Sequence, residues 1–127
     1  MTTTTTILYK AILSNLEQRS ELFTAAIKTY PVGTLLARDT STQKLVPYVK
    51  GGATNGNGII NSILTAELVA GAVQDYSVDV TISARVDKDL LIIDADGNAS
   101  NIDAVLVDEM AKMSIYAQSY SKLSQTF

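Results

Sequence analysis

The chain has 127 residues, of which 46% are apolar and 18% are charged, and its formal net charge at pH 7 is −3. This size and composition predict a single folded domain with a hydrophobic core of its own. The sequence contains no cysteine and no histidine. Disulfides, thiolate chemistry, the usual catalytic triad and the common zinc sites are therefore excluded.

The charge pattern bears on possible partners. Lysine and arginine are scattered along the chain without forming a basic cluster, so we do not expect nucleic acid to be a partner. No segment approaches the roughly 20 consecutive apolar residues of a membrane span. The first residues lack the basic start and long apolar stretch of an export signal, which predicts a protein made in the cytoplasm without membrane insertion.

The N-terminus is of low complexity. Five threonines, Thr2, Thr3, Thr4, Thr5 and Thr6, precede Ile7, Leu8 and Tyr9. Threonine favours extended backbone, but this run has no apolar face to bury. The segment is either a flexible terminus or an arm that adds as a strand to a partner.

Residues Ile12 to Ile27 allow two interpretations. Ser14 and Glu17 have the spacing of a capping box, which favours a helix. The same stretch could instead be an irregular approach to a strand near Glu21–Ala25. Periodicity does not decide between them.

The segment from Pro31 to Tyr48 predicts two short strands. Leu35 and Leu36 belong to the first strand, and the polar residues Asp39–Gln43 form a turn. Leu45 to Val49 form the second strand. Because proline cannot donate a hydrogen bond to a neighbouring strand, Pro47 favours a position at the edge of the sheet for this second strand. Gly51–Gly58 is a glycine-rich loop. After it, the expected core residues are Ile59, Ile60, Ile63, Leu64, Leu68 and Val69.

The clearest pattern lies between Tyr76 and Val86, where apolar and polar residues alternate. This period of two predicts a half-buried strand. A short apolar segment, Leu90–Ile93, and a turn at Asp94–Asn98 follow. Ser100 is expected to cap a helix that carries Asp103 in its first turn, with an apolar face made of Ile102, Val105, Leu106, Met110 and Met113.

The last segment, Ile115 to Phe127, could add a final strand or contact a partner. Tyr116 and Tyr120 in it could belong either to the core or to an interface. Together these elements predict a small, mainly β domain of the α+β class, barrel-like, with one C-terminal helix and an extended N-terminal arm.

No chemical motif is complete. Asp94–Asn98 resembles the start of a calcium loop, but the template requires glycine and glutamate where Ala99 and Val105 stand. The glycines between Gly51 and Gly58 lack the lysine of a phosphate loop. The cluster Asp87-Lys88-Asp89 is expected to be a solvated turn. We therefore predict no catalytic residue, no metal, no cofactor and no enzymatic activity.

The order of several segments does resemble a known family. These are Pro31-Val32-Gly33-Thr34-Leu35-Leu36-Ala37-Arg38, the return Lys44-Leu45-Val46-Pro47-Tyr48, the glycine loop, Ile60-Asn61-Ser62-Ile63-Leu64, Val69-Ala70-Gly71-Ala72 and the alternating strand that ends before Leu90-Leu91. In this order they resemble the lambda-type head decoration (capsid cement) proteins of tailed bacteriophages. The resemblance covers roughly Glu21 to Leu91 and part of the C-terminal helix.

The resemblance implies a structural protein of the virion. Such proteins bind the outer surface of the expanded head as homotrimers, at local threefold points of the major capsid protein, and stabilise it against internal DNA pressure. Residues 1–20 would form the capsid-binding arm, with Thr2 to Tyr9 in contact, and residues 21–127 the decoration domain. Candidate contacts between subunits are Gly51, Gly52, Asn55, Tyr116, Tyr120 and Phe127.

Two other classes of function stay open. The chain could be a different phage or surface interaction module, such as a head fibre base, a tail component or a carbohydrate-binding β domain. An enzyme of unfamiliar type would need converging Asp, Lys or Tyr side chains, and the sequence offers no pair to nominate.

Overall fold

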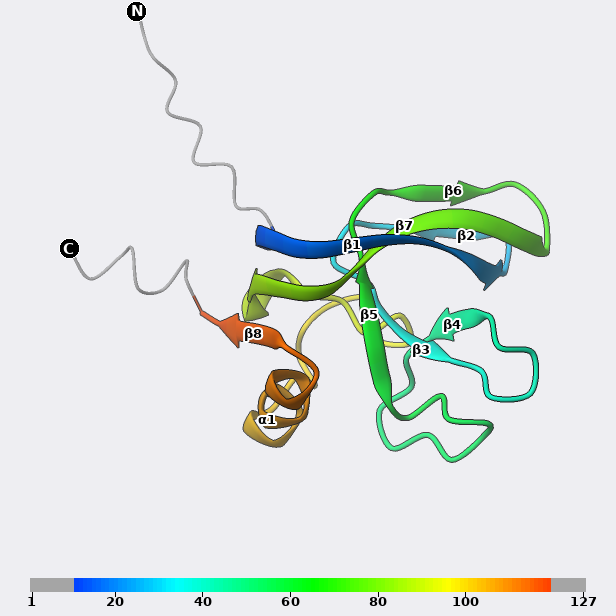
Figure 1. Cartoon of the computed structure of the whole chain (residues 1–127). Helices are drawn as coiled ribbons and strands as arrows, with labels where there is room; N and C mark the ends of the chain where they lie inside the picture. The colour runs from blue at the N-terminus through cyan, green and yellow to red at the C-terminus, as the bar shows by residue number, and fades with distance from the viewer. Residues whose placement is uncertain (1–10, 120–127) are drawn as a thin grey trace, which may run out of the picture.

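The computed structural model describes residues 11–119 of the chain. The predicted contact residues Thr2–Tyr9, Tyr120 and Phe127 lie outside the described residues. The elements run in the order β1 (Ile12–Ala25), β2 (Lys28–Tyr30), β3 (Leu35–Arg38), β4 (Leu45–Pro47), β5 (Ile60–Leu64), β6 (Leu68–Ala70), β7 (Gln74–Asp87), a 3-10 turn η1 (Lys88–Leu90), α1 (Ala104–Lys112) and β8 (Ile115–Gln118) (Figure 1).

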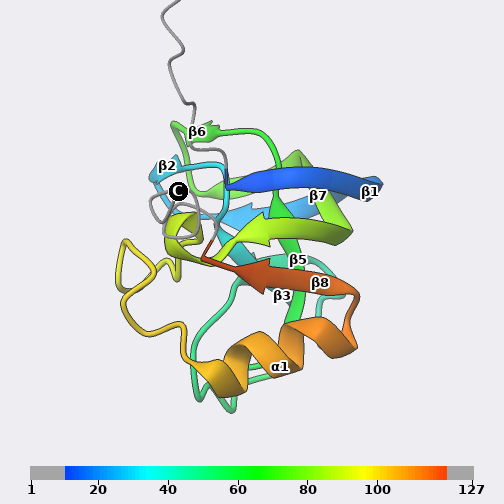
Figure 2. The same cartoon turned by 90° about the vertical axis from the view of Figure 1, so that its left-hand side faces the viewer.

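Five strands close into a barrel in the order β1-β4-β3-β5-β7, and β7 pairs back onto β1. Strand β8 extends the sheet by pairing in parallel with β7, while β2 and β6 form a separate two-stranded sheet. Figure 2 shows β1, β7 and β8 side by side, with α1 alongside β8. The predicted class, a small mainly β domain with one C-terminal helix, is confirmed.

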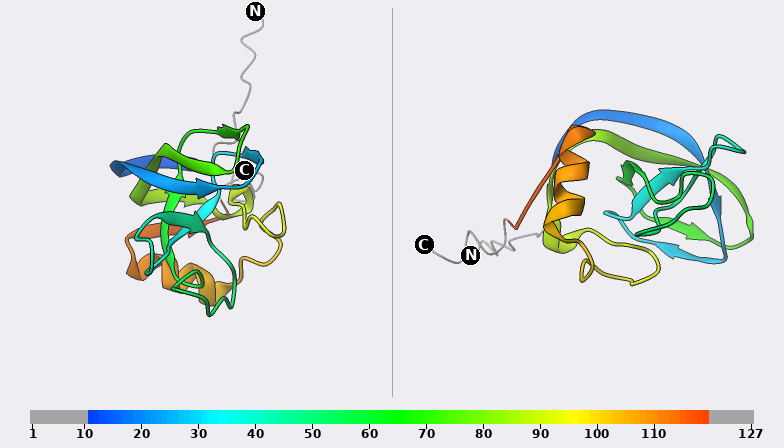
Figure 3. Two further views of the ribbon diagram at one scale, coloured as in Figure 1. Left: turned by 90° about the vertical axis from the view of Figure 1, so that its right-hand side faces the viewer. Right: turned by 90° about the horizontal axis from the view of Figure 1, so that it is seen from below.

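Strand β7 forms because its residues alternate as predicted. Val78 and Val80 are buried in one cluster of the core, and Ala84 and Val86 are buried in the other. One edge of β7 pairs antiparallel with β1 along nearly its whole length, and the other edge pairs with β5 and then with β8. The two long strands curve together around the barrel, as the view from below in Figure 3 shows.

The barrel closes at Phe23. This residue is the one position of β1 that pairs with β4, in parallel and opposite Leu45. Its side chain is fully buried, and its ring lies edge-on to Tyr30 with 4.9 Å between the ring centroids. Next to this contact, Arg38 Nη2 donates to both carboxylate oxygens of Glu21 at 2.8 and 2.7 Å, which ties β1 to β3.

The core consists of two clusters. The first cluster lies around Phe23, Tyr30, Leu36 and Val80. The second lies beneath α1 and contains Leu106 and Met110 of the helix with Leu35 and Ile115 of the sheet. Because Leu35 and Leu36 are consecutive in β3 but belong to different clusters, the two clusters lie on opposite faces of this strand, and α1 covers the face that carries Leu35.

The open interpretation of residues 12–27 is resolved in favour of a strand. β1 begins at Ile12, so the alternative with a helix capped by Ser14 is wrong. The predicted domain boundary between residues 20 and 21 falls inside this strand, and residues 12–20 pair with β7 as part of the sheet. The helix signals at Ser14 and Glu17 are outweighed, because β7 provides backbone hydrogen-bond partners along almost the whole of this segment.

The helix starts later than predicted. Asp103, not Ser100, is its N-cap, since the Asp103 side chain accepts a hydrogen bond from the amide of Leu106 at 2.9 Å. The Ser100 amide instead donates to Asn98 Oδ1 at 2.8 Å, within the preceding turn. The short helix buries only one narrow stripe.

Several predicted core residues lie outside the core. Val105 and Met113 are exposed on α1, and Ile59 and Val69 are exposed beside β5 and on β6. The remaining predicted members are buried or half-buried.

The prediction of a solvated turn at residues 87–89 is wrong for Asp87. Its side chain is only 2% exposed. It caps η1 by accepting a hydrogen bond from the Asp89 amide at 3.1 Å. The end of β7 is therefore part of the packed interior.

Two turns follow the sequence closely. Asp39 Oδ1 accepts hydrogen bonds from the Ser41 amide at 2.8 Å and from the Ser41 hydroxyl at 2.6 Å, which fixes the predicted turn between β3 and β4. Gly33 has φ +96°, and a Cβ there would lie 2.8 Å from the Leu90 carbonyl oxygen and 2.9 Å from the Ala11 Cβ. Only glycine suits both the backbone angle and the space.

We expect Phe23→Ala to lower the free energy of unfolding by about 3–5 kcal/mol, because it removes a large buried ring at the closure of the barrel. Leu22→Ala on the same strand removes a half-exposed side chain and should cost less than about 1 kcal/mol. Urea unfolding of both variants tests this. Equal losses would show that Phe23 has no special part in closing the barrel.

Gly33→Ala should cost about 2–4 kcal/mol, since it combines a left-handed backbone with a steric overlap. Gly71→Ala is the matched control, because a Cβ at Gly71 meets nothing within 4 Å. Its stability should stay within about 1 kcal/mol of the wild type. A loss of stability for Gly33→Ala as small as that for Gly71→Ala would contradict the close approach of residues 11, 33 and 90.

Candidate binding surfaces

The structure separates the predicted subunit contacts that it describes. Gly51, Gly52 and Asn55 lie in the loop between β4 and β5, and Tyr116 lies on β8. In Figures 1 and 3 this loop and β8 lie on opposite sides of α1. They do not form one patch, so the two groups could contact only different neighbours or different parts of one neighbour.

The glycine loop is packed against the body of the protein. Lys50 Nζ donates to the Asn101 carbonyl and to Asp103 Oδ2, both at 2.7 Å, which ties the loop to the start of α1. Within the loop, a Cβ at Gly58 would overlap the backbone of Gly52. These glycines therefore have a structural role in letting the two sides of the loop touch.

Tyr116 offers an exposed aromatic side chain. Half of it is accessible, and its position in the register is opposite Arg85 of β7. An exposed ring beside a guanidinium group is a common composition for a protein-contact surface. The side chain is therefore compatible with the predicted interface role.

A groove of about 750 Å³ lies between the first half of β1, the segments that follow β2 and β5, and Leu90 of η1. Among the described residues Asp79 is the one carboxylate that lines it, and this carboxylate accepts a hydrogen bond from the Ser20 hydroxyl at 2.9 Å. Asn15 and Gln18, also on its wall, are hydrogen-bonded to each other at 2.7 Å. The described lining residues therefore include no pair of acid and base groups.

Within residues 11–119 no group of acidic side chains is arranged to hold a metal ion. In the same range, no helix is long and apolar enough to cross a membrane.

The first half of β1 is a surface that the sequence did not reveal. Eight of the ten residues from Leu13 to Leu22 are exposed, and they include three leucines. The pairing with β7 shifts register three times in this half, so Leu13 and Leu16 are extra residues of β-bulges. In the sequence, the only indication of this exposed surface is the mixture of leucine with polar residues in the first half of β1, and that mixture is equally compatible with a helix.

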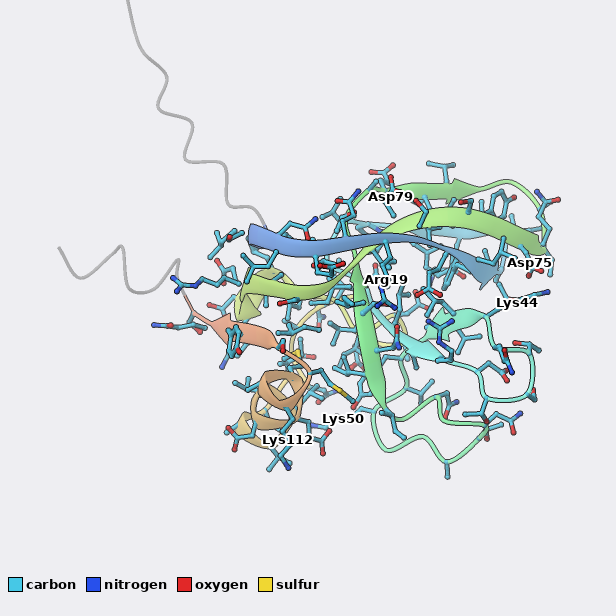
Figure 4. The ribbon with its side chains drawn as sticks, viewed as in Figure 1. Arg19, Lys44, Lys50, Asp75, Asp79 and Lys112 are labelled. Carbon is cyan, nitrogen blue, oxygen red and sulfur yellow. The ribbon has the colours of Figure 1, made fainter. Side chains whose placement is uncertain are left out.

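Charges are paired unevenly over the surface. Within residues 11–119, four ion pairs join distant segments: Lys28–Asp94, Arg38–Glu21, Lys44–Asp75 and Lys50–Asp103. Figure 4 shows Lys44 and Asp75 together at one end of the barrel, and Asp79 and Arg19 on opposite sides of the β1–β7 ribbon. No ion pair joins Glu17 or Arg19 to any other residue between 11 and 119.

Comparison with known proteins adds no family assignment. No protein-family model matches the chain, and no curated protein matches it at a significant level.

The ion pair at Asp75 predicts a pH-dependent contribution to stability. Hydrogen bonds from the Lys44 ammonium and the Thr24 hydroxyl hold the pKa of Asp75 below its ordinary value of 3.8. Because the folded state lowers this pKa, the stabilisation is present above pH 3.8 and is lost as the pH falls through the folded pKa.

We therefore expect Asp75→Asn to be less stable than the wild type at pH 7, with the difference vanishing below that pKa. Thermal unfolding across pH 2–7 measures it. Lys44→Gln should remove most of the same contribution to stability at pH 7. The double variant Lys44→Gln/Asp75→Asn should be little less stable than either single variant. Additive losses would show that the two side chains act separately.

Proposed function

We propose that the protein is a capsid decoration protein that binds the outer surface of an expanded phage head as a homotrimer and stabilises the shell. Most of the segments that carry the resemblance to decoration proteins fold together: the β3–β4 hairpin, β5 and β7 are consecutive partners in one barrel, whereas Val69 and Ala70 belong to β6 in the two-stranded sheet. This observation supports a common architecture and carries the proposal.

The position of the chain ends supports a binding role for the terminal segments. The Asp87 amide donates to the Ala11 carbonyl at 2.8 Å, so the chain enters β1 beside the end of β7. On the other side of β7, Gln118 pairs with Asp87, and the Ser119 hydroxyl donates to Asp89 at 3.3 Å. Ala11 and Ser119, at the two ends of the described chain, therefore lie at the same end of β7.

This arrangement suits a multivalent clamp. In a trimer, three arms of the composition Thr2–Tyr9 would start from equivalent points on one rigid body. Each arm could add as a strand to a shell subunit. Three weak contacts made at once give an affinity well above that of one contact. The function needs no chemistry at the site, only a rigid barrel and correctly placed arms.

The test is co-sedimentation with expanded, undecorated heads. Deletion of Thr2–Tyr9 should weaken binding by about 100-fold or more, because all three arms are lost together. The melting temperature should not change, since the deletion leaves the barrel and its core intact. A control variant that replaces these residues with a Gly/Ser segment of equal length separates arm length from arm sequence.

Two outcomes would contradict the proposal. Failure of the full chain to bind heads would reject the decoration function. Equal binding by the full chain and the deletion variant would reject the arm as the contact and leave the barrel surface as the alternative.

A further inference from the structure

The outer edge of β1 has no strand partner over most of its length. One edge of β1 pairs with β7, but on the other edge the described residues provide a single partner, Leu45 opposite Phe23. Between Gln18 and Leu22, beyond the last register shift with β7, the backbone groups on this edge therefore have no ladder partner within residues 11–119. Such an edge is a template for another strand.

The edge of β1 is only partly protected against pairing. Exposed edge strands are commonly guarded by charged side chains, β-bulges, proline or short length. β1 has 14 residues and contains neither lysine nor proline, and its bulges lie at Leu13 and Leu16, before the stretch from Gln18 to Leu22. Leu13, Leu16 and Leu22 are 45%, 60% and 49% exposed. A long edge with three exposed leucines is better explained by a strand that covers it than by permanent contact with water.

The charges on the edge form a self-complementary pattern. Glu21 is already paired with Arg38. The remaining charges are Glu17 and Arg19, which lie two residues apart and so belong to the same face of the strand. They stand symmetrically about Gln18. An antiparallel copy of the same strand, centred on Gln18, would present an arginine to each glutamate.

We propose that this edge binds the same edge of a second copy of the chain, antiparallel, with a twofold axis at Gln18. Glu17 of each copy then faces Arg19 of the other, so the contact contains two ion pairs. The result is a continuous sheet in the order β7-β1-β1-β7.

The neighbouring elements define the length of the contact. The register pairs Ser14 with Leu22 at each end, and β4 occupies the edge at the next position, Phe23. The ladder therefore fills the free part of β1 and stops where the barrel closes. A twofold contact of this kind is isologous, because both copies use the same surface.

This inference is independent of the proposed capsid function. It uses neither the Thr2–Tyr9 segment of the predicted arm nor any residue predicted for the trimer contacts. Both contacts could exist in one assembly, in which case the number of subunits would be even.

The first experiment uses the absence of cysteine from the chain. At the twofold axis, Gln18 lies directly opposite Gln18 of the second copy, at a Cα separation of roughly 4.5–5.5 Å that suits a disulfide. Gln18→Cys should therefore form a covalent dimer under mild oxidation. Val73→Cys, an exposed position at the other end of the ribbon, is the control. Similar cross-linking rates for the two variants would overturn the proposal.

The second experiment reverses the charges. Glu17→Lys or Arg19→Glu places like charges opposite each other twice, and should raise the dissociation constant of the dimer about tenfold. The double variant Glu17→Arg/Arg19→Glu restores both ion pairs and should bind as the wild type does. Glu109→Lys and Lys112→Glu change the net charge equally at exposed positions on α1 and should have no effect.

Sedimentation equilibrium supplies the readout, and circular dichroism checks that each variant is folded. A wild-type mass of twice 13.6 kDa, or a larger even multiple, together with rescue by the double variant, supports the proposal. A monomer at every concentration overturns it, and so does a trimer that the reversals do not disturb.

Discussion

The pairing of β1 with β7 is the constraint on which the rest of the structure depends. β7 alternates apolar and polar residues over most of its length, and it gives one edge to β1 and the other to β5 and β8. β1 then reaches β4 at Phe23 and closes the barrel. Without this long ribbon the short strands β3, β4 and β5 would form only a small open sheet, too short to enclose a core.

The same ribbon divides the molecule into two regions of different character. At the Phe23 end, buried aromatic rings and the ion pairs Glu21–Arg38 and Lys44–Asp75 hold the strands together. At the Ala11 end, three register shifts loosen the ladder and leave β1 exposed. A rigid end and an exposed end on one strand suit a protein that acts by contact rather than by chemistry, and both proposals place that contact near the exposed end.

Much of the fold could be predicted from local patterns. The alternation in β7, the polar turn at Asp39–Gln43 and the apolar stripe of α1 each carry a signal within a few residues, because backbone geometry imposes a period on buried positions. The candidate surfaces were less predictable. The glycine loop and Tyr116 were expected to share an interface role, but the chain path places them on opposite sides of α1. The exposed edge of β1 was missed, since exposure of an edge depends on which strands lie beside it.

The sequence by itself determined the mainly β class, the late helix, the hairpin and the absence of cysteine and histidine chemistry. The tertiary structure decided whether residues 12–25 are helix or strand, which residue caps α1, and whether Asp87, Ile59 and Val69 are buried. The physical reason is the range of the interactions. Turns and amphipathic stripes depend on residues a few positions apart, whereas Ile12 pairs with Val86, more than 70 residues away, and the burial of a side chain depends on which distant segments pack against it.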